Sequence, residues 1–339
     1  MYTEGNVEPF SGGSENKTVQ VSSSGEWEKL LSAFIQNLDA KDATKKQYRK
    51  TLTLFFQWVD NNHIDVRTLT RAHILAYRKE LLEGERRLSG QTVAAYIVGI
   101  RRLFEWAEAE KIYPNIAKGI KAPRVRKDFI KQHLTSDECT QMLENLFDDI
   151  ENKTRQRLYK QKEANGLRDY AIINLLLRTG LRTVEVARLD VGDITFRRRK
   201  HVLLVWGKGH DTKDDYVPLS DKAYAPIMTY LATRPSAMPT DPLFVCEGYG
   251  SRGRRISPRR IQAICKEALR SIGLDDHAFS AHSFRHTCAV MLIQSGASAY
   301  DTQKFLRHSS IDTTEIYLRS IEEDLRLERS PERMLDNKF

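Results

Sequence analysis

Residues 281–319 read AHSFRHTCAVMLIQSGASAYDTQKFLRHSSIDTTEIYLR, and this stretch decides how the rest of the chain is interpreted. His282 and Arg285 stand three residues apart in an apolar run, so one helix would carry both side chains on one face. Histidine exchanges protons near neutral pH, and arginine offers a planar fork of donors to phosphate oxygens. His308 and Tyr317 follow, nine positions apart. A phenol becomes a useful nucleophile only when a neighbouring group favours its charged form.

Two upstream segments carry matching chemistry. The segment RTGLRTVEVARLDVGDI places Arg182 and Glu185 three residues apart, after a Thr-Gly turn that should end an apolar helix. The segment HVLLVWGKGHDTKDDYVPLS places Lys208 between two glycines, with strand-like residues on both sides. Taken singly, residues of these kinds most often only face solvent. Their combination indicates chemistry on a phosphate group.

One set of six residues, in chain order, resembles the tyrosine recombinase (phage integrase) family, and the resemblance covers nearly the whole chain. The set is Arg182, Lys208, His282, Arg285, His308 and Tyr317. The resemblance implies that Arg182 and Arg285 clamp the non-bridging oxygens of a DNA phosphate, a bidentate geometry that lysine cannot copy. Glu185 matches an acidic position of the family and would brace the site by hydrogen bonds.

The resemblance also implies the reaction. Tyr317 would attack phosphorus to give a 3′-phosphotyrosyl link and a free 5′-hydroxyl. His282 would help to accept the phenolic proton, His308 would orient the phosphate, and Lys208 would donate a proton to the departing oxygen. No metal or other cofactor is implied, and the sequence has no Walker loop, GxGxxG or His-Glu zinc pattern.

Composition sets the frame for this interpretation. The chain has 339 residues, which suggests two domains, and a surplus of nine positive charges, which fits a polyanionic partner. Its apolar runs are too short to cross a bilayer, and its polar N-terminus has no signal core, so we expect a cytoplasmic protein without a membrane partner. The four cysteines are scattered, which indicates neither a zinc site nor a disulfide framework.

The first half of the chain is expected to bind DNA. Residues 1–24 should be a disordered tail, and residues 25–112 should form a bundle of four amphipathic helices, with Asp42 and Ser89 as N-caps. This bundle resembles the SAM-like core-binding domain of the family. Residues 113–133 contain two prolines and many basic residues, and we interpret them as an extended linker that completes a clamp around the duplex.

The second half should hold the chemistry. Residues 134–325 are expected to form the catalytic domain, built mainly of helices with one small antiparallel β-sheet from strands near 194–196, 202–206 and 216–219. Residues 326–339 would be a C-terminal tail, docked on a neighbouring protomer or packed on its own chain. The fold class is therefore mainly α with a small antiparallel sheet.

Basic residues are expected to contact DNA in three places. Five arginines crowd into residues 252–260, where they would repel one another without an anion. The predicted DNA-binding residues are Lys45, Lys46, Arg49, Arg101 and Arg102 of the bundle, Lys121, Arg124 and Arg126 of the linker, and Arg254, Arg255, Arg259 and Arg260 of the catalytic domain.

The favoured function is a site-specific recombinase that acts as a homotetramer on two double-stranded DNA duplexes with paired recognition half-sites, in the simple arrangement of Xer and Cre members. An accessory directionality factor is a further expected partner. Two alternatives stay open: a strand transferase like type IB topoisomerases or telomere resolvases, and a catalytically silent DNA-binding regulator.

Two positions depart from the family pattern. Arg307 stands where glycine often precedes the histidine, and Arg319 stands where histidine is common. Neither change removes a catalytic group. Arg307 is expected to bind phosphate or to hold the tyrosine segment.

Overall fold

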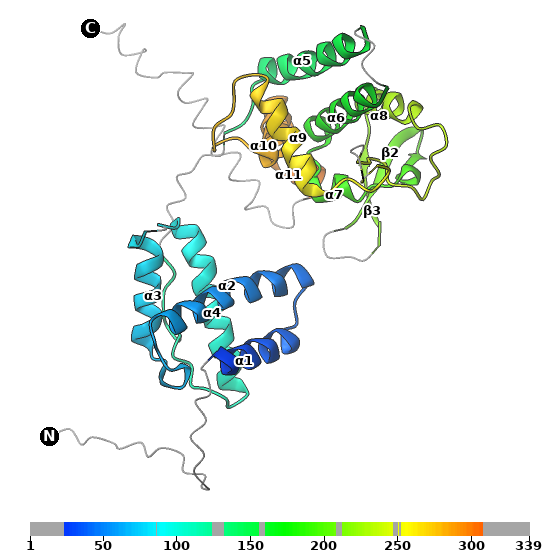
Figure 1. The fold of residues 1–339 in the computed structure, drawn as a ribbon. Helices are drawn as coiled ribbons and strands as arrows, with labels where there is room; N and C mark the ends of the chain where they lie inside the picture. The colour runs from blue at the N-terminus through cyan, green and yellow to red at the C-terminus, as the bar shows by residue number, and fades with distance from the viewer. Residues whose placement is uncertain are drawn as a thin grey trace, which may run out of the picture. The chain divides into compact units, whose positions relative to one another are not determined.

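The structure is a computed structural model that describes residues 24–85, 87–123, 132–155, 160–207, 212–246, 250 and 252–307 (Figure 1). The chain divides into two units, residues 1–128 and 129–339, and each unit has its own hydrophobic core. The predicted fold class, mainly helical with a small antiparallel sheet, is confirmed. Predictions for Arg124, Arg126, Lys208, His308, Tyr317 and Arg319, for residues 1–23 of the N-terminal tail, and for the C-terminal tail lie outside the described residues.

The first unit is a bundle of four helices. They are α1 (Ser24–Asn37), α2 (Asp42–Asn61), α3 (Arg71–Glu83) and α4 (Gly90–Ala109), with a short 3₁₀ turn η1 (Val66–Thr68) before α3. Apolar residues recur every three or four positions along each helix, so one face of each turns inward. Trp27 of α1 stacks on Phe56 of α2 at 5.2 Å between ring centroids, and its indole N–H donates to Asp60 at 2.8 Å.

The predicted helix starts are nearly right. The Ser89 hydroxyl accepts from the Thr92 N–H at 3.2 Å, which is the N-cap that the sequence indicated. The prediction for α2 was wrong by one residue, because Lys41 is the N-cap and Asp42 lies in the first turn. A carboxylate there still favours the helix by facing its positive end.

Residues 113–121 differ from the predicted extended linker, because they pack onto the bundle. Ala117 and Ile120 are 1% and 2% exposed and belong to the bundle core. The Arg71 guanidinium donates to the carbonyl of Lys118, and Arg78 donates to that of Lys121 at 2.9 Å. The buried side chains of Ala117 and Ile120 and the two arginine–carbonyl hydrogen bonds therefore hold this segment on the bundle, although its composition predicted an extended chain.

The second unit surrounds one long helix. Its helices are α5 (Ser136–Arg155), α6 (Lys160–Thr179), α7 (Thr183–Ala187), α8 (Asp221–Ala232), α9 (Pro258–Arg270), α10 (Ala281–Gln294) and α11 (Ala299–Leu306). Ile172, Ile173 and Leu176 of α6 are buried, and α6 contacts α5, α8, α9 and α10 (Figure 1). This helix is therefore the centre of the second core.

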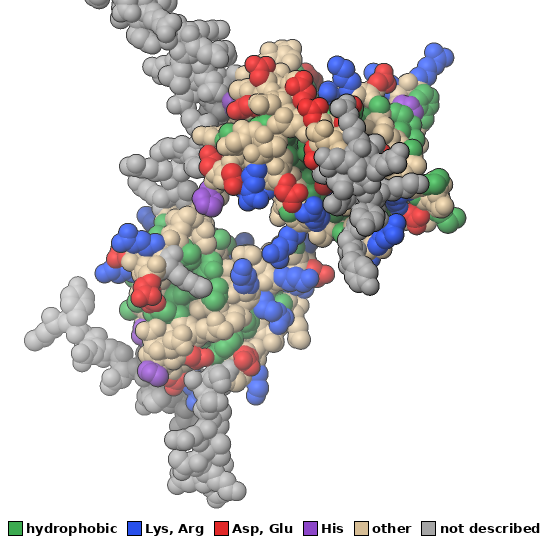
Figure 2. All heavy atoms as spheres, turned by 45° about the horizontal axis from the view of Figure 1, so that its top comes forward, with side chains coloured by type: hydrophobic (Ala, Val, Ile, Leu, Met, Phe, Trp, Pro, Cys, Tyr) green, Lys and Arg blue, Asp and Glu red, His purple; other side chains and the backbone are tan. Residues whose placement is uncertain are grey.

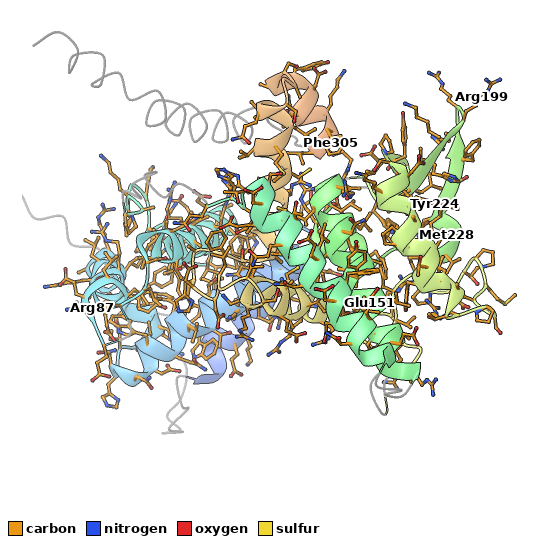
Figure 3. The ribbon with its side chains drawn as sticks, turned by 90° about the horizontal axis from the view of Figure 1, so that it is seen from above. Arg87, Glu151, Arg199, Tyr224, Met228 and Phe305 are labelled. Atoms are coloured by element: carbon orange, nitrogen blue, oxygen red, sulfur yellow. The ribbon has the colours of Figure 1, made fainter. Side chains whose placement is uncertain are left out.

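A three-stranded sheet completes the second unit. After the 3₁₀ turn η2 (Val191–Asp193) come β1 (Ile194–Arg197), β2 (Lys200–Val205) and β3 (Asp215–Pro218), paired antiparallel in the order β1-β2-β3. Val205 pairs with Asp215 at one end of the β2–β3 ladder. The β1–β2 turn lies at the other end of β2, where Arg199 marks its tip in Figure 3. Among the described residues, no helix has the length and apolarity that a membrane span requires.

Candidate active site

Arg285 lies at the centre of the candidate site. It is on α10, whose start is capped by the Ser280 hydroxyl accepting from the His282 N–H at 3.3 Å. The Arg285 side chain is 2% exposed, and its guanidinium donates to the backbone carbonyls of Gly180 and Leu306. One side chain thus joins the turn after α6 to the last residue of α11.

His282 stands one helical turn before Arg285 on the same helix, as the spacing indicated. The two residues differ in burial, because His282 is exposed whereas Arg285 is buried. An exposed imidazole can exchange a proton with solvent or substrate, while a buried guanidinium provides a fixed positive charge. Helix α10 therefore carries an exposed imidazole one turn before a buried, hydrogen-bonded guanidinium.

Arg182 is the N-cap residue of α7 and is held by Glu185. The Arg182 backbone N–H donates to Glu185 Oε2 at 2.6 Å, and Arg182 Nη1 donates to Oε1 at 3.0 Å. The Arg182 side chain remains 35% exposed, so it is both oriented and accessible. This is the geometry that a bracing role for Glu185 requires.

Arg307 also binds Glu185, which the sequence did not indicate. Its Nη2 lies 3.0 Å from Glu185 Oε2, and its Nε lies 3.6 Å from Asp215 Oδ2 on β3. The side chain is 11% exposed. Its neighbour Phe305 lies on α11, as Figure 3 shows. In the described structure Arg307 therefore contacts two carboxylates, those of Glu185 and Asp215.

Gly180 and Asp215 are supporting residues that the search for functional side chains missed. Gly180 has φ +59°, and a Cβ there would lie 2.5 Å from Leu306 Cδ2. Only the Thr-Gly turn signal pointed to Gly180, and it indicated the end of a helix. Nothing local marked Asp215, because its partner is far away in sequence.

The charges of the site favour an anion. Arg182, Arg285 and Arg307 carry three positive charges against the two carboxylates of Glu185 and Asp215. Arginine is charged at all ordinary pH values, so this surplus is permanent. Within the part of the chain that the structure describes, no group of three or more His, Cys, Asp or Glu side chains could hold a metal ion.

Two of the catalytic candidates outside the described residues, Lys208 and His308, have described neighbours. Lys208 follows Val205 by three residues in the sequence. The base of that loop is closed by the Val205–Asp215 pair and by the Gly207 N–H donating to Asp214 at 3.2 Å. His308 directly follows Arg307.

Two arginines of the run at the start of α9 have partners within the protein. Arg255 donates to the carbonyls of Ala187 at 3.2 Å and Leu189 at 2.8 Å, and it pairs with Asp190. Arg260 pairs with Glu267 at 3.0 Å. The argument that these arginines need an external anion was therefore wrong for two of them.

The other described residues that were predicted to bind DNA are exposed or half-buried. Figure 2 shows Lys and Arg side chains gathered on part of the first unit. In the first unit Lys46, Arg49 and Arg102 are exposed, and Lys45 and Arg101 are half-buried. Arg102 also pairs with Glu105 at 3.2 Å. In the second unit Arg254 and Arg259 are exposed, and Lys121 is exposed at the end of the first.

Comparison with known proteins identifies relatives over most of the chain. A tyrosine recombinase XerC of Corynebacterium glutamicum is 39% identical over 46% of this chain and 47% of its own, so that alignment spans about half of the relative. A tyrosine recombinase XerC of Actinobacillus pleuropneumoniae is 30% identical over 68% of each chain. A solved XerH site-specific recombinase, bound to a palindromic difH substrate in a post-cleavage complex, is similar in fold, with a TM-score of 0.68 and 21% identity over 91% of this chain and 84% of that one.

Two family matches divide the chain at the same region as its two structural units. Residues 31–111 match the phage integrase N-terminal SAM-like domain, and residues 134–323, more than half of the chain, match the phage integrase family. The site described above lies entirely within the second match. The chain therefore belongs to the phage integrase family, the tyrosine recombinases.

Proposed function

We propose that this protein is a site-specific DNA recombinase that cuts and rejoins strands through a 3′-phosphotyrosyl intermediate. The observation that carries the proposal is the Arg285 guanidinium, which binds the carbonyls of Gly180 and Leu306. These contacts bring together residues two positions before Arg182 and two positions before His308. Groups scattered over more than a hundred residues of sequence thus meet around one buried cation.

In the proposed reaction, the Tyr317 oxygen attacks phosphorus and the bond from phosphorus to the 5′-oxygen breaks. His282 accepts the phenolic proton, and Lys208 donates a proton to the departing 5′-oxygen, so no net charge accumulates on either oxygen. Arg182 and Arg285 stabilise the charge on the non-bridging oxygens, with His308 orienting the phosphate. A well-placed general acid contributes roughly 10² to 10⁴ in rate.

The same groups serve the reverse step. A 5′-hydroxyl from another strand attacks the phosphotyrosyl phosphorus, and the tyrosine oxygen leaves with a proton returned to it. One phosphodiester is exchanged for another, so the cycle needs no nucleotide to drive it. Rejoining to the original strand would relax DNA, whereas rejoining to a partner strand recombines it.

Duplex DNA is the proposed partner; a solved protein of similar fold, the XerH site-specific recombinase, is bound to its palindromic difH substrate. We assign residues 25–112 to core binding and residues 134–325 to catalysis. Exposed Lys46, Arg49 and Arg254 would contact phosphates, and each such contact would steepen the salt dependence of binding. Paired half-sites, a homotetramer on two duplexes, an accessory directionality factor and a cytoplasmic location complete the proposal.

The test is a search for the covalent intermediate. Purified protein in EDTA is incubated with nicked duplexes that carry sequence flanking its own gene, and the products are run on a denaturing gel. A protein–DNA band that is lost in Tyr317→Phe, while DNA binding persists, is the expected result. Binding without a band on every genome-selected site would instead support the silent regulator.

A further inference from the structure

We infer that Arg307 is a positioning residue that couples the Arg182–Glu185 pair to the base of the loop carrying Lys208. The inference rests on the proposed function, because it assigns Arg307 a part in that same site. Arg307 is not proposed to touch the substrate. It acts through two carboxylates, Glu185 and Asp215.

The backbone of Arg307 is the first observation. Arg307 follows the last residue of α11 with φ +54° and ψ +48°, the left-handed conformation. Helices commonly end with glycine in this conformation, because a Cβ atom is crowded there. Arginine in this conformation therefore carries a steric cost, which contacts of its side chain can offset.

The contacts of the side chain are the second observation. Arg307 Nη2 lies 3.0 Å from Glu185 Oε2, while the other carboxylate oxygen, Oε1, accepts from Arg182 at 3.0 Å. The two arginines therefore share one carboxylate, each using a different oxygen for its side-chain contact. With Arg307 and Glu185 only 11% and 13% exposed, water competes little for these bonds.

The second carboxylate leads to the loop. Arg307 Nε lies 3.6 Å from Asp215 Oδ2, and Asp215 pairs with Val205 at the point where the β2–β3 ladder ends. The nine residues between that pair, 206–214, include Lys208. The ion pair with Asp215 therefore links Arg307 to the base from which the Lys208 loop departs.

Arg307 also lies between two parts of the proposed site along the chain. The carbonyl of Leu306 before it accepts from Arg285, and His308 follows it. One residue thus connects the end of α11, the start of α7 and the start of β3. A small displacement of these segments would misalign both the phosphate clamp and the general acid, and a shift of about 1 Å can cost about 10² in rate.

The test begins with substitutions that suit the backbone. Glycine and asparagine both accept the left-handed conformation, so Arg307→Gly and Arg307→Asn remove the guanidinium without adding strain. We expect the affinity for DNA to stay within about threefold, while the single-turnover rate of adduct formation falls roughly 10- to 100-fold. Arg307→Lys should recover part of the rate. Arg270→Asn, which removes a different ion-paired arginine at 3.0 Å from Asp275, should leave the rate unchanged.

Two modified substrates separate positioning from general damage to the fold. A sulfur at the 5′-bridging position leaves without a general acid, so it bypasses Lys208. A methylphosphonate at the cleaved position replaces one charged oxygen, so it bypasses part of the arginine clamp. If Arg307 positions both groups, each substrate should shrink the defect of Arg307→Gly and neither should abolish it.

The outcomes are separable. Equal defects on all three substrates, or a full wild-type rate for Arg307→Gly, would overturn the inference while leaving the recombinase intact. A defect that shrinks on only one modified substrate would overturn the coupling, because Arg307 would then serve one group alone. Absence of an adduct with the wild-type protein would overturn the proposed function itself, and the inference with it.

Discussion

Replacing Gly180 by alanine should destabilise the second unit and disturb the site together. Gly180 has φ +59°, and an added Cβ would lie 2.5 Å from Leu306 Cδ2 and 3.4 Å from Cys288 Sγ. The end of a leucine side chain can often move aside. Leu306 cannot do so freely, because it is 0% exposed and packed in a cluster with Cys288 and Ala289.

The magnitude has two parts. Placing alanine in the left-handed conformation costs about 1–2 kcal/mol, and forcing a methyl group into a packed core costs about 1–3 kcal/mol. The sum, about 2–5 kcal/mol, should lower the melting temperature of the second unit by roughly 4–20 °C at the 2–4 °C per kcal/mol typical of this size. Movement of Leu306 would also displace the carbonyl that binds Arg285.

Gly273→Ala is the matched control. Gly273 has φ +82° in the same unit, but an added Cβ would meet nothing within 4 Å. It therefore reports the backbone cost without the contact. Calorimetry or circular dichroism should give Gly180→Ala a clearly larger drop in melting temperature than Gly273→Ala. Equal drops would refute the reasoning, because the Leu306 contact would then have no cost.

Three further outcomes are expected. Thr287→Val should lose about 1–3 kcal/mol in urea unfolding, because the buried Leu134 N–H loses its acceptor at 2.8 Å, whereas Thr287→Ser should not. Burial raises the pKa of the Cys139, Cys265 and Cys288 thiols to about 12. Alkylation of the native protein at pH 8, followed by peptide mapping, should therefore label Cys246 preferentially, and equal labelling of all four cysteines would contradict this. Burial acts to raise the pKa of Asp190, but hydrogen bonds from basic neighbours outweigh it and lower the pKa. The resulting stability is present above the unfolded pKa of about 4 and is lost as pH falls through the pKa of the folded state. The free energy of unfolding of the wild type should therefore fall more than that of Asp190→Asn between about pH 5 and pH 3.

Local signals predicted the elements well. The Ser89 cap, the three strands and the helix that carries His282 and Arg285 all follow from side chains within a few residues of one another. Capping and amphipathic spacing act over one or two turns, so the residues that determine these elements lie close together in the sequence. The same holds for Gly180, whose Thr-Gly signal ended α6 where predicted.

Partners far apart in sequence explain what the sequence could not predict. Arg255 binds Leu189 and Asp190, 66 and 65 residues away, so it has structural contacts that its local sequence did not predict. Ala117 and Ile120 are buried by the bundle, although their own segment is polar and contains prolines. In both cases composition described the segment correctly and the fold supplied the missing partner.

The arrangement of the site follows from how each arginine is compensated. The carbonyls of Gly180 and Leu306 are neutral, so they orient Arg285 without cancelling its charge. Glu185 does cancel charge, but it is shared between Arg182 and Arg307, and therefore neutralises neither fully. If Arg307 were absent, the whole carboxylate would fall to Arg182, and the positive potential at the phosphate would drop. Arg307 thus keeps Arg182 both oriented and available to an anion. In an isolated arginine–glutamate pair, a stronger contact would orient the arginine better but would leave less of its positive charge for the anion.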